Sequence, residues 1–251
     1  MEALRVAYNK DHGKSNPIPK GPPEQVWNAL RKRFHEKCKD MDACMVHSLL
    51  GKVSAPMSWS SKPSEWLSST DIEKVQENYT KLVPEYYFAG CVPIDFALKS
   101  DTGKCLVSTL CSLDIRKIYS QGQTMIGIVM NTDPHDEPGE HWIAAFCDLR
   151  PELETPYMAY FDSYAQKPEK EVVELMNAWK EQWDSTKKHR KPMELIYNKI
   201  RHQYKTTECG VYCIYFIHCS IFGIPMETRI PDDVMQMMRQ FFFTLPKKKG
   251  R

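Results

Sequence analysis

The sequence predicts an α+β fold in which a mixed central sheet is flanked by helices. Short apolar runs of strand length recur in the second half of the chain, at 125–131, 141–148, 157–161 and 193–197. Longer segments before, between and after these runs carry apolar residues at helical spacing, separated by polar ones. Together the two patterns predict a core built from one sheet and the helices packed against it.

The composition is that of a folded protein rather than a disordered or membrane-spanning one. The 251 residues are 42% hydrophobic and 11% aromatic, which is enough to bury a sizeable core. The N-terminus lacks the apolar stretch of a secretory signal, and no run of about 18 apolar residues could span a bilayer. We therefore expect a soluble, intracellular protein.

The charge balance and the cysteine content indicate which partners and which cellular compartment to expect. Lys and Arg number 34 and Asp and Glu 32, a balance that implies no strong general attraction to nucleic acid. Two basic clusters, at 187–191 and 247–251, motivate nucleic-acid binding only weakly, because such ends are usually solvated. The nine cysteines are scattered through predicted helices and strands, which favours reduced thiols and a cytosolic type of compartment.

The chain divides into a predicted N-terminal helical arm, residues 1–63, and a core, residues 64–251. The boundary rests on a stretch rich in Pro, Ser and Gly, a composition typical of linkers. The arm comprises a polar lead-in that we expect to be mobile (1–23), two predicted helices (24–38 and 43–50) and this linker (51–64).

Helices are also predicted within the core. A helix capped by Thr70 or Asp71 runs to about 82, and a short one is expected over 93–98. An amphipathic helix over about 168–183 and a final one over 231–243 complete the set.

The run from Cys209 to Phe222 is apolar nearly all round and is closed by Gly223, which predicts a buried helix. Cys209 would then lie at a helix N-terminus, where free N–H groups and the macrodipole favour a negative charge. A thiol placed there beside an imidazole ionises readily and can act as a nucleophile. The alternative is that Cys209 is a buried core cysteine, as we expect for Cys213 and Cys219.

A cysteine nucleophile needs a base and a group that orients that base. Among the eight histidines, His141 opens an apolar strand directly after a polar loop, which suits a side chain at the rim of a sheet. If strands 141–148 and 157–162 form an antiparallel hairpin, the start of the first meets the end of the second. That register would place Asp162 beside His141, although Asp is also a common residue at a strand end.

Two further residues complete the candidate site. Gln203 precedes Cys209 by six positions, and its side-chain amide could donate to a developing oxyanion together with the Cys209 N–H. Gly210 would let a substrate backbone approach closely.

These residues together resemble the Ulp1-type and adenovirus-type cysteine proteases (clan CE). In that clan the chain order is His, then an acid or amide, then Gln, then Cys, which matches His141, Asp162, Gln203 and Cys209. The segment Glu65-Trp-Leu-Ser-Ser-Thr-Asp-Ile72 is similar to the Trp-Leu-Asn-Asp element of the SUMO-protease branch, with Ser-Ser in place of Asn-Asp. The resemblance implies that Trp66 and Trp142 flank a narrow channel for a Gly-Gly tail, against the alternative of two core tryptophans.

Within the clan, the chain resembles the polyprotein-processing proteases of African swine fever virus and related large cytoplasmic DNA viruses. The matching blocks include Glu140-His-Trp-Ile-Ala-Ala-Phe-Cys-Asp-Leu-Arg150, Tyr160-Phe-Asp-Ser163 and Thr207-Glu-Cys-Gly210. The swine fever type has Asn where this chain has Asp162, the residue commoner in the wider clan. The resemblance implies cleavage of viral structural polyproteins after Gly-Gly or similar small pairs during virion maturation, in the host cytoplasm (viral factory) and the virion.

Three other interpretations remain open. The same channel would suit an isopeptidase acting on ubiquitin or a SUMO-like protein, and the fold could also serve as a catalytically silent binding scaffold. His35, Cys38, Cys44 and His47 have the side chains of a zinc site but not its usual spacing. We therefore expect no metal and no cofactor.

Overall fold

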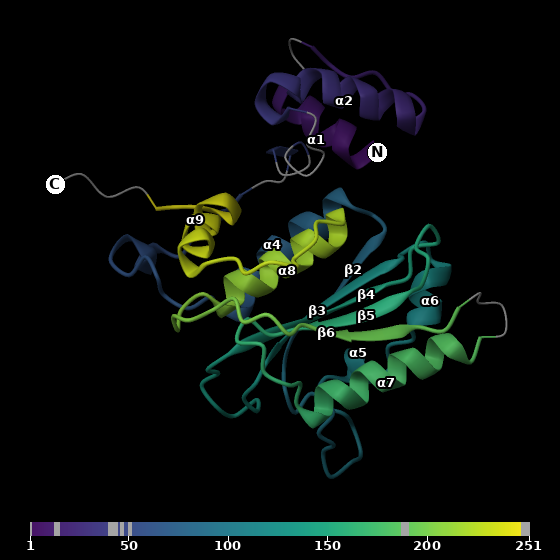
Figure 1. Ribbon diagram of the computed structural model, residues 1–251, viewed down its shortest axis with the longest axis vertical. Coiled ribbons are helices and arrows are strands. Elements are labelled where there is room, and N and C mark those ends of the chain that lie inside the picture. The colour runs from purple at the N-terminus through teal and green to yellow at the C-terminus, as the bar shows by residue number, and fades with distance from the viewer. Residues whose placement is uncertain are drawn as a thin grey trace.

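The computed structural model describes residues 2–12, 16–39, 45, 48–49, 52–186 and 191–246. Its centre is a five-stranded sheet in the order β2-β3-β4-β5-β6. The outer pairs β2–β3 and β5–β6 are parallel, and the inner pairs are antiparallel, so the predicted mixed sheet is confirmed (Figure 1). The strands are β2 (Tyr86–Pro93), β3 (Met125–Asn131), β4 (Trp142–Asp148), β5 (Tyr157–Phe161) and β6 (Glu194–Tyr197).

Helices cover both faces of this sheet (Figure 1). Alternate residues of a strand point to opposite faces, so each central strand feeds two cores. On one face Val129, Ala144 and Phe146 pack with α4 (Ser69–Leu82) and α8 (Cys209–Phe222). On the other, Ile128 and Ala145 pack with α5 (Ser108–Cys111), α6 (Ile115–Ser120) and α7 (Lys170–Asp184).

Helix α8 lies against the middle of the sheet and begins at the residue that the sequence predicts. Its side chains are buried almost all round, because both the sheet and neighbouring helices cover it. Gly223 ends it with a left-handed backbone (φ 66°), a conformation that costs glycine little. Helix α4 is capped two or three residues earlier than predicted, because Ser68 forms a reciprocal capping box with Asp71.

The N-terminal arm has its own small apolar cluster. Helices α1 (Glu2–His12) and α2 (Pro23–Cys38) bury Leu4 and Leu30 against each other. The cluster also reaches Leu82 at the end of α4 and Phe222 at the end of α8, which joins the arm to the core. The lead-in predicted to be mobile therefore contains a helix, and most of the predicted helix 43–50 lies outside the described residues.

Part of the predicted linker belongs to the core. Strand β1 (Val53–Ser54) pairs in parallel with β7 (Phe243–Thr244), directly after α9 (Asp232–Phe242). The short 3-10 helix η1 (Met57–Ser60) buries Trp59 against Phe243. The prediction of a linker over 51–64 is wrong for this stretch, because its few apolar side chains find partners near the far end of the chain.

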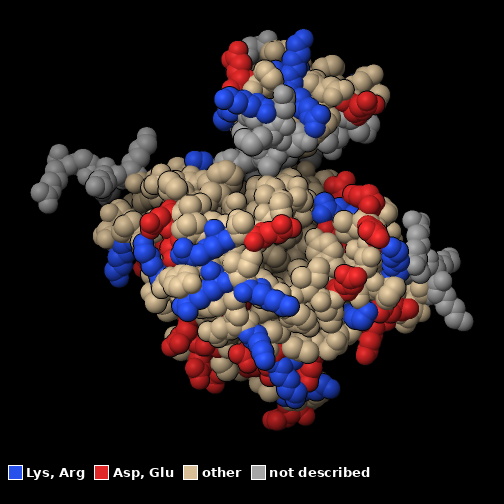
Figure 2. All heavy atoms as spheres, in the orientation of Figure 1, with Lys and Arg blue, Asp and Glu red and all other residues tan. Residues whose placement is uncertain are grey.

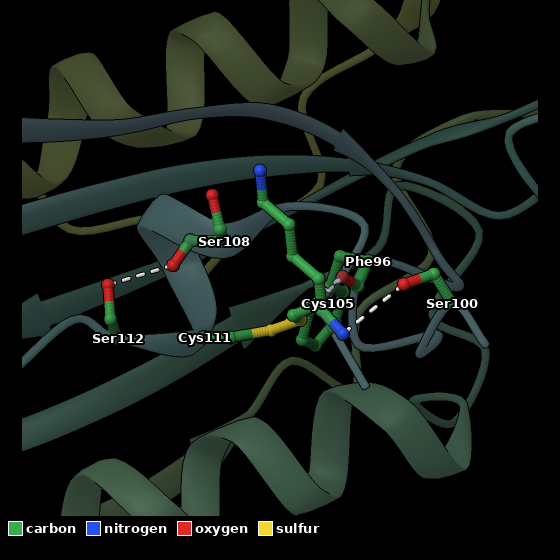
Figure 3. Close-up of a disulfide and its surroundings, with 7 residues drawn as sticks. Phe96, Ser100, Cys105, Ser108, Cys111 and Ser112 are labelled. Carbon is green, nitrogen blue, oxygen red and sulfur yellow. Dashed lines mark hydrogen bonds between the residues drawn. A yellow bond between two sulfur atoms is a disulfide. The ribbon is translucent and has the colours of Figure 1, made fainter. Parts of the chain in front are cut away.

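Two further predictions are corrected. Residues 93–98 form the end of β2 and a turn rather than a helix. Cys105 and Cys111 are joined by a disulfide beside Phe96, so the expectation of reduced thiols fails at this pair (Figure 3). The free cysteines among the described residues are Cys91, Cys147, Cys209, Cys213 and Cys219.

The described helices are all too short or too polar to cross a bilayer. The basic cluster 247–251 and residues 187–190 of the other cluster lie outside the described part of the chain. On the face shown in Figure 2, basic and acidic side chains are interspersed over the core, in line with the near-neutral net charge.

Candidate active site

Cys209 is the first residue of α8, and it is only 2% exposed. The residue before it, Glu208, makes no side-chain cap, so the N–H groups of the first turn remain directed out of the helix end. Together with the helix dipole they create a positive electrostatic potential at this end of the helix.

His141 lies immediately before β4 and Asp162 immediately after β5, and the antiparallel pairing of these strands brings the two side chains together. The Nε2 atom of His141 is 2.7 Å from Oδ1 of Asp162. The carboxylate also accepts hydrogen bonds from the backbone N–H groups of Tyr164 and Gln166, each at 2.9 Å. The predicted pairing is confirmed, and the carboxylate is held rigidly.

The electrostatics of His141 reflect two opposing influences. Burial lowers its pKa, but hydrogen bonds to Asp162 and to Cys209, together with their negative charges, outweigh burial and raise the pKa to about 9. Since Nε2 is bonded to Asp162, Nδ1 is left for the thiol. The imidazole is therefore bonded on one side to a carboxylate and on the other to Cys209, and its protonated form is favoured.

Gln203 is fully buried, and its side-chain amide is hydrogen-bonded at both ends. The amide oxygen accepts from the Ser163 hydroxyl at 2.6 Å, and Nε2 donates to the Lys205 carbonyl at 2.7 Å. An amide nitrogen carries two hydrogens, so one N–H remains for another acceptor. The Lys205 carbonyl can only accept a hydrogen bond, so it sets which end of the amide is the donor.

Gly210 has a packing reason to be glycine. A Cβ atom there would lie 3.1 Å from Cβ of Leu67, tighter than an ordinary contact. Leu67 in turn accepts a hydrogen bond from the indole Nε1 of Trp142 at 2.9 Å. The close approach of α8 to the segment before α4 thus fixes one of the two tryptophans; the predicted contact of Gly210 with substrate stays a prediction.

Trp66 and Trp142 both line a groove of about 740 Å³. Its walls are residues 65–71 on one side and the loop 131–139 on the other. Trp66 is 44% exposed, which excludes a role as a core tryptophan. Trp142, which follows His141, lines the groove, whereas His141, Asp162, Gln203 and Cys209 lie outside its lining.

Several contributors to this site are not apparent from the sequence. Tyr164 stacks on the His141 ring, and Asn198 holds the backbone N–H of Asp162 at 2.8 Å. His135 pairs with Asp95 at 2.6 Å and anchors the loop that lines the groove. The only sequence signal for Tyr164 is its place two residues after Asp162.

The other two core histidines have structural partners. His218 lies 2.8 Å from the Tyr79 hydroxyl, further along α8, and cannot reach the thiol. His202 is buried and accepts from the N–H of Ile230 through Nδ1.

The zinc hypothesis involves residues that the structure describes only in part, because Cys44 and His47 lie outside the described residues. Within the described ranges, no three His, Cys, Asp or Glu side chains converge in a way that could hold a metal ion.

With this geometry established, the chain was compared with known proteins. Residues 124–249, half of the chain, match the Ulp1 protease family, C-terminal catalytic domain. The chain belongs to the Ulp1 protease family. It is accordingly a cysteine protease, and the matched region includes His141, Asp162, Gln203 and Cys209.

Relatives of this Ulp1-family protease occur in large DNA viruses. The putative thiol protease R355 of Acanthamoeba polyphaga mimivirus is 25% identical over 229 residues, 86% of this chain and 71% of that protein. The cysteine protease S273R of African swine fever virus is 33% identical over 123 residues. That match spans 47% of this chain and 44% of the viral protein.

Solved structures share the fold of this Ulp1-family protease. The crystal structure of the African swine fever virus pS273R protease matches with a TM-score of 0.65 at 20% identity, covering 98% of this chain and 91% of that chain. The yeast Ulp1 protease domain in complex with Smt3, the yeast ortholog of SUMO, matches with a TM-score of 0.51 at 15% identity, covering 90% and 96%.

Proposed function

We propose that this Ulp1-family protease cleaves peptide bonds by acyl transfer to Cys209, with His141 as general base and acid. The Cys209 sulfur attacks the scissile carbonyl carbon, and His141 holds the thiol proton on Nδ1. The C–N bond then breaks as His141 returns this proton to the leaving amine. Water, deprotonated by His141, next hydrolyses the thioester and releases the carboxylate product.

Asp162 and Gln203 have supporting roles in this proposal. Asp162 keeps a proton on Nε2 and so holds the ring in the tautomer that presents Nδ1 to the cysteine. The second N–H of the Gln203 amide and the backbone N–H of Cys209 stabilise the oxyanion of the tetrahedral intermediate. The bond to the Lys205 carbonyl supports this role, because it holds the amide nitrogen in place with one of its two N–H groups and leaves the other N–H for the oxyanion.

One observation carries the proposal: the His141 imidazole is bonded at once to the Asp162 carboxylate and to the Cys209 thiol, at the start of a buried helix. The raised pKa of His141 favours an imidazolium beside the sulfur. A catalytically silent scaffold would have no need for this arrangement.

For the substrate, we propose a viral structural polyprotein cut after a Gly-Gly or similar small pair during virion maturation. The groove between residues 65–71 and 131–139 supports an extended substrate, and its tryptophans favour residues without bulky side chains. The similarity to proteases of African swine fever virus and mimivirus supports a viral setting. Accordingly, we place the activity in the host cytoplasm, at the viral factory, and in the virion.

A second candidate is removal of a SUMO-like or ubiquitin-like protein from a conjugate. It is favoured by the likeness to the Ulp1 domain bound to Smt3, and several African swine fever virus relatives are named SUMO-1 cysteine proteases. A Gly-Gly tail would fit the same groove. The two candidates differ in whether the folded body of a ubiquitin-like protein adds affinity.

The test of the catalytic assignment is the rate of Cys209 alkylation as a function of pH. Iodoacetamide labelling is followed by mass mapping, which separates Cys209 from the other eight cysteines. We expect fast labelling at pH 7 that falls by about tenfold or more in His141→Ala. A His12→Ala variant in the arm is the matched control and should label like the wild type; equal labelling in His141→Ala would contradict the assignment.

The substrate is tested by cleavage of two probes. Internally quenched Gly-Gly-X peptides are compared with a fluorogenic SUMO conjugate at equal concentration. If kcat/KM for the folded conjugate exceeds kcat/KM for the peptides by more than about a hundredfold, the isopeptidase function is supported. If the two kcat/KM values are within about tenfold of each other, polyprotein processing is supported.

A further inference from the structure

Tyr164 makes three separate contacts with groups of the candidate active site. The first is through its backbone, whose N–H donates to Oδ1 of Asp162 at 2.9 Å. This is the same oxygen that lies 2.7 Å from Nε2 of His141. A tight turn places the residue there, because the N–H of Ala165 bonds to the Asp162 carbonyl and Ala165 adopts a positive φ of 59°.

The second contact is made by the ring. It stacks on the His141 imidazole with a centroid distance of 4.9 Å and an interplanar angle of 30°. The Arg201 guanidinium lies 5.5 Å from the centre of the Tyr164 ring and adds a further hold on it. A stacked ring limits rotation of the imidazole about χ2 and shields it from water, so that Nδ1 stays directed at Cys209.

The third contact is made by the hydroxyl, which donates to the backbone carbonyl of Lys205 at 2.9 Å. The same carbonyl oxygen accepts from Nε2 of Gln203 at 2.7 Å. A carbonyl oxygen has two lone pairs, so it can hold both donors at once. One carbonyl therefore connects the tyrosine stacked on His141 with the amide of Gln203.

We propose that Tyr164 is a positioning residue that couples the imidazole of His141 to the amide of Gln203 through the carbonyl of Lys205. Its ring sets the orientation of the general base, and its hydroxyl fixes the carbonyl that orients the oxyanion donor. The proposal rests on the catalytic roles given to His141 and Gln203 above. It adds that these two groups are aligned by one side chain rather than independently.

The ring and the hydroxyl can be tested separately. Tyr164→Phe keeps the stack and removes the bond to Lys205, so we expect kcat for a Gly-Gly-X peptide to fall about three- to tenfold with KM unchanged. Tyr164→Leu removes the stack as well, and we expect a fall in kcat of about tenfold to a hundredfold. Only Tyr164→Leu should lower the pKa of His141 in an NMR titration and slow the alkylation of Cys209.

A double-mutant cycle separates positioning from a general loss of structure. If the hydroxyl acts through the amide, Tyr164→Phe should cost nothing further in a Gln203→Ala background. Tyr204→Phe is the matched control, because that ring is 60% exposed and contacts Arg201 instead of His141. We expect it to behave as the wild type, and circular dichroism is used to check that each variant is folded.

Two results would overturn the inference: wild-type kcat in Tyr164→Phe, or a full additional loss when it is combined with Gln203→Ala. An unchanged alkylation rate and His141 pKa in Tyr164→Leu would remove the role of the ring. Failure of the proposed function looks different, because Cys209 would then not depend on His141 in the wild type. Alkylation needs no substrate, so the role of the ring is decided even if neither cleavage probe is a substrate.

Discussion

At the scale of single residues, the site depends on how His141 is held between two negative partners. Hydrogen bonds to Asp162 and Cys209 overcome the effect of burial and raise the pKa of His141 to about 9. Its ordinary value in an unfolded chain is about 6.5. Folding therefore increases proton affinity at this residue, which links the stability of the protein to pH.

The sign of this linkage gives a first prediction. A group whose pKa is raised on folding stabilises the folded state fully below its unfolded pKa, and this stability is lost as the pH rises through the folded value. We expect His141→Gln to lower the free energy of unfolding by up to about 3 kcal/mol at pH 6. The difference from the wild type should shrink steadily between pH 6.5 and 9.

Urea unfolding at pH 6, 7.5 and 9.5 measures this difference. An Asp162→Asn variant serves as a comparison, because it removes one of the two partners that raise the pKa and should show a smaller pH dependence. A difference between His141→Gln and the wild type that stays constant across this pH range would contradict the linkage.

The pairing of His141 with Asp162 was predictable because local sequence signals determine its geometry. His141 and Asp162 flank consecutive strands of one hairpin, so the register alone brings them together. Cys209 follows from the apolar run that it opens. By contrast, the hydrogen bonds made by Ser163, Tyr164 and Gln203 depend on tertiary structure. Tyr164 and Gln203 both bond to a backbone carbonyl, a group that every residue carries and that no sequence pattern marks.

At the scale of elements, the same distinction explains which helices and strands were predicted. Helix α8 and strands β3 and β5 have apolar patterns strong enough to define their bounds. Strand β2 was missed because it contains Gly90 and ends at Pro93, both poor strand formers, and its register with β3 shifts between Phe88 and Cys91. It exists because β3 offers a long buried edge for parallel pairing.

Helix α9 contributes an element-scale feature through one buried arginine. Arg239 is 1% exposed and pairs with Glu208, the residue before Cys209, at 2.7 Å. It also donates to the carbonyls of Glu65 and Thr207, at 2.7 and 2.9 Å. One side chain thus joins the segment that carries Trp66 to the start of α8.

Removing this side chain should be costly. Arg239→Met leaves Glu208 buried without its partner, and we expect a loss of about 3 to 5 kcal/mol in the free energy of unfolding. Adding Glu208→Gln should recover part of that loss, because the uncompensated charge is then gone. Urea unfolding of the two single variants and the double variant measures the coupling between them.

A matched control is an exposed ion pair that also joins α9 to the segment just before α8. Lys205 and Asp233 form an ion pair at 2.7 Å whose side chains are exposed to solvent. Lys205→Met should leave stability unchanged, because solvent screens exposed pairs. If the free energy of unfolding of Arg239→Met equals that of Lys205→Met, the buried pair does not stabilise the contact between α9 and the start of α8.

At the scale of the whole molecule, the arm and the protease core meet through the ends of α4 and α8. Leu82 and Phe222 cover the apolar cluster of the arm, about as far along these helices from Cys209 as the elements allow. This placement suggests that the arm stabilises the core without taking part in the chemistry. The domain boundary remains a prediction, and the pairing of β1 with β7 favours placing it before residue 52.

Deletion of residues 1–51 tests this separation. Exposure of Leu82 and its neighbours should lower the melting temperature by roughly 5 to 10 °C. Alkylation of Cys209 at pH 7 should proceed at the wild-type rate. A full-length Leu82→Ala variant is the control for the lost contact, and loss of Cys209 reactivity in the truncated chain alone would show that the arm helps to build the site.

The pairing of β1 with β7 also has a consequence for the time at which the enzyme becomes complete. Lys52 bonds to the carbonyl of Gln240, 188 positions further along, and Arg239 reaches back to Glu65 across 174 positions. Contacts of such long range form late in folding, and during translation they must wait until α9 has left the ribosome. The segment that carries Trp66 therefore reaches its place beside the start of α8 only after α9 has been synthesised.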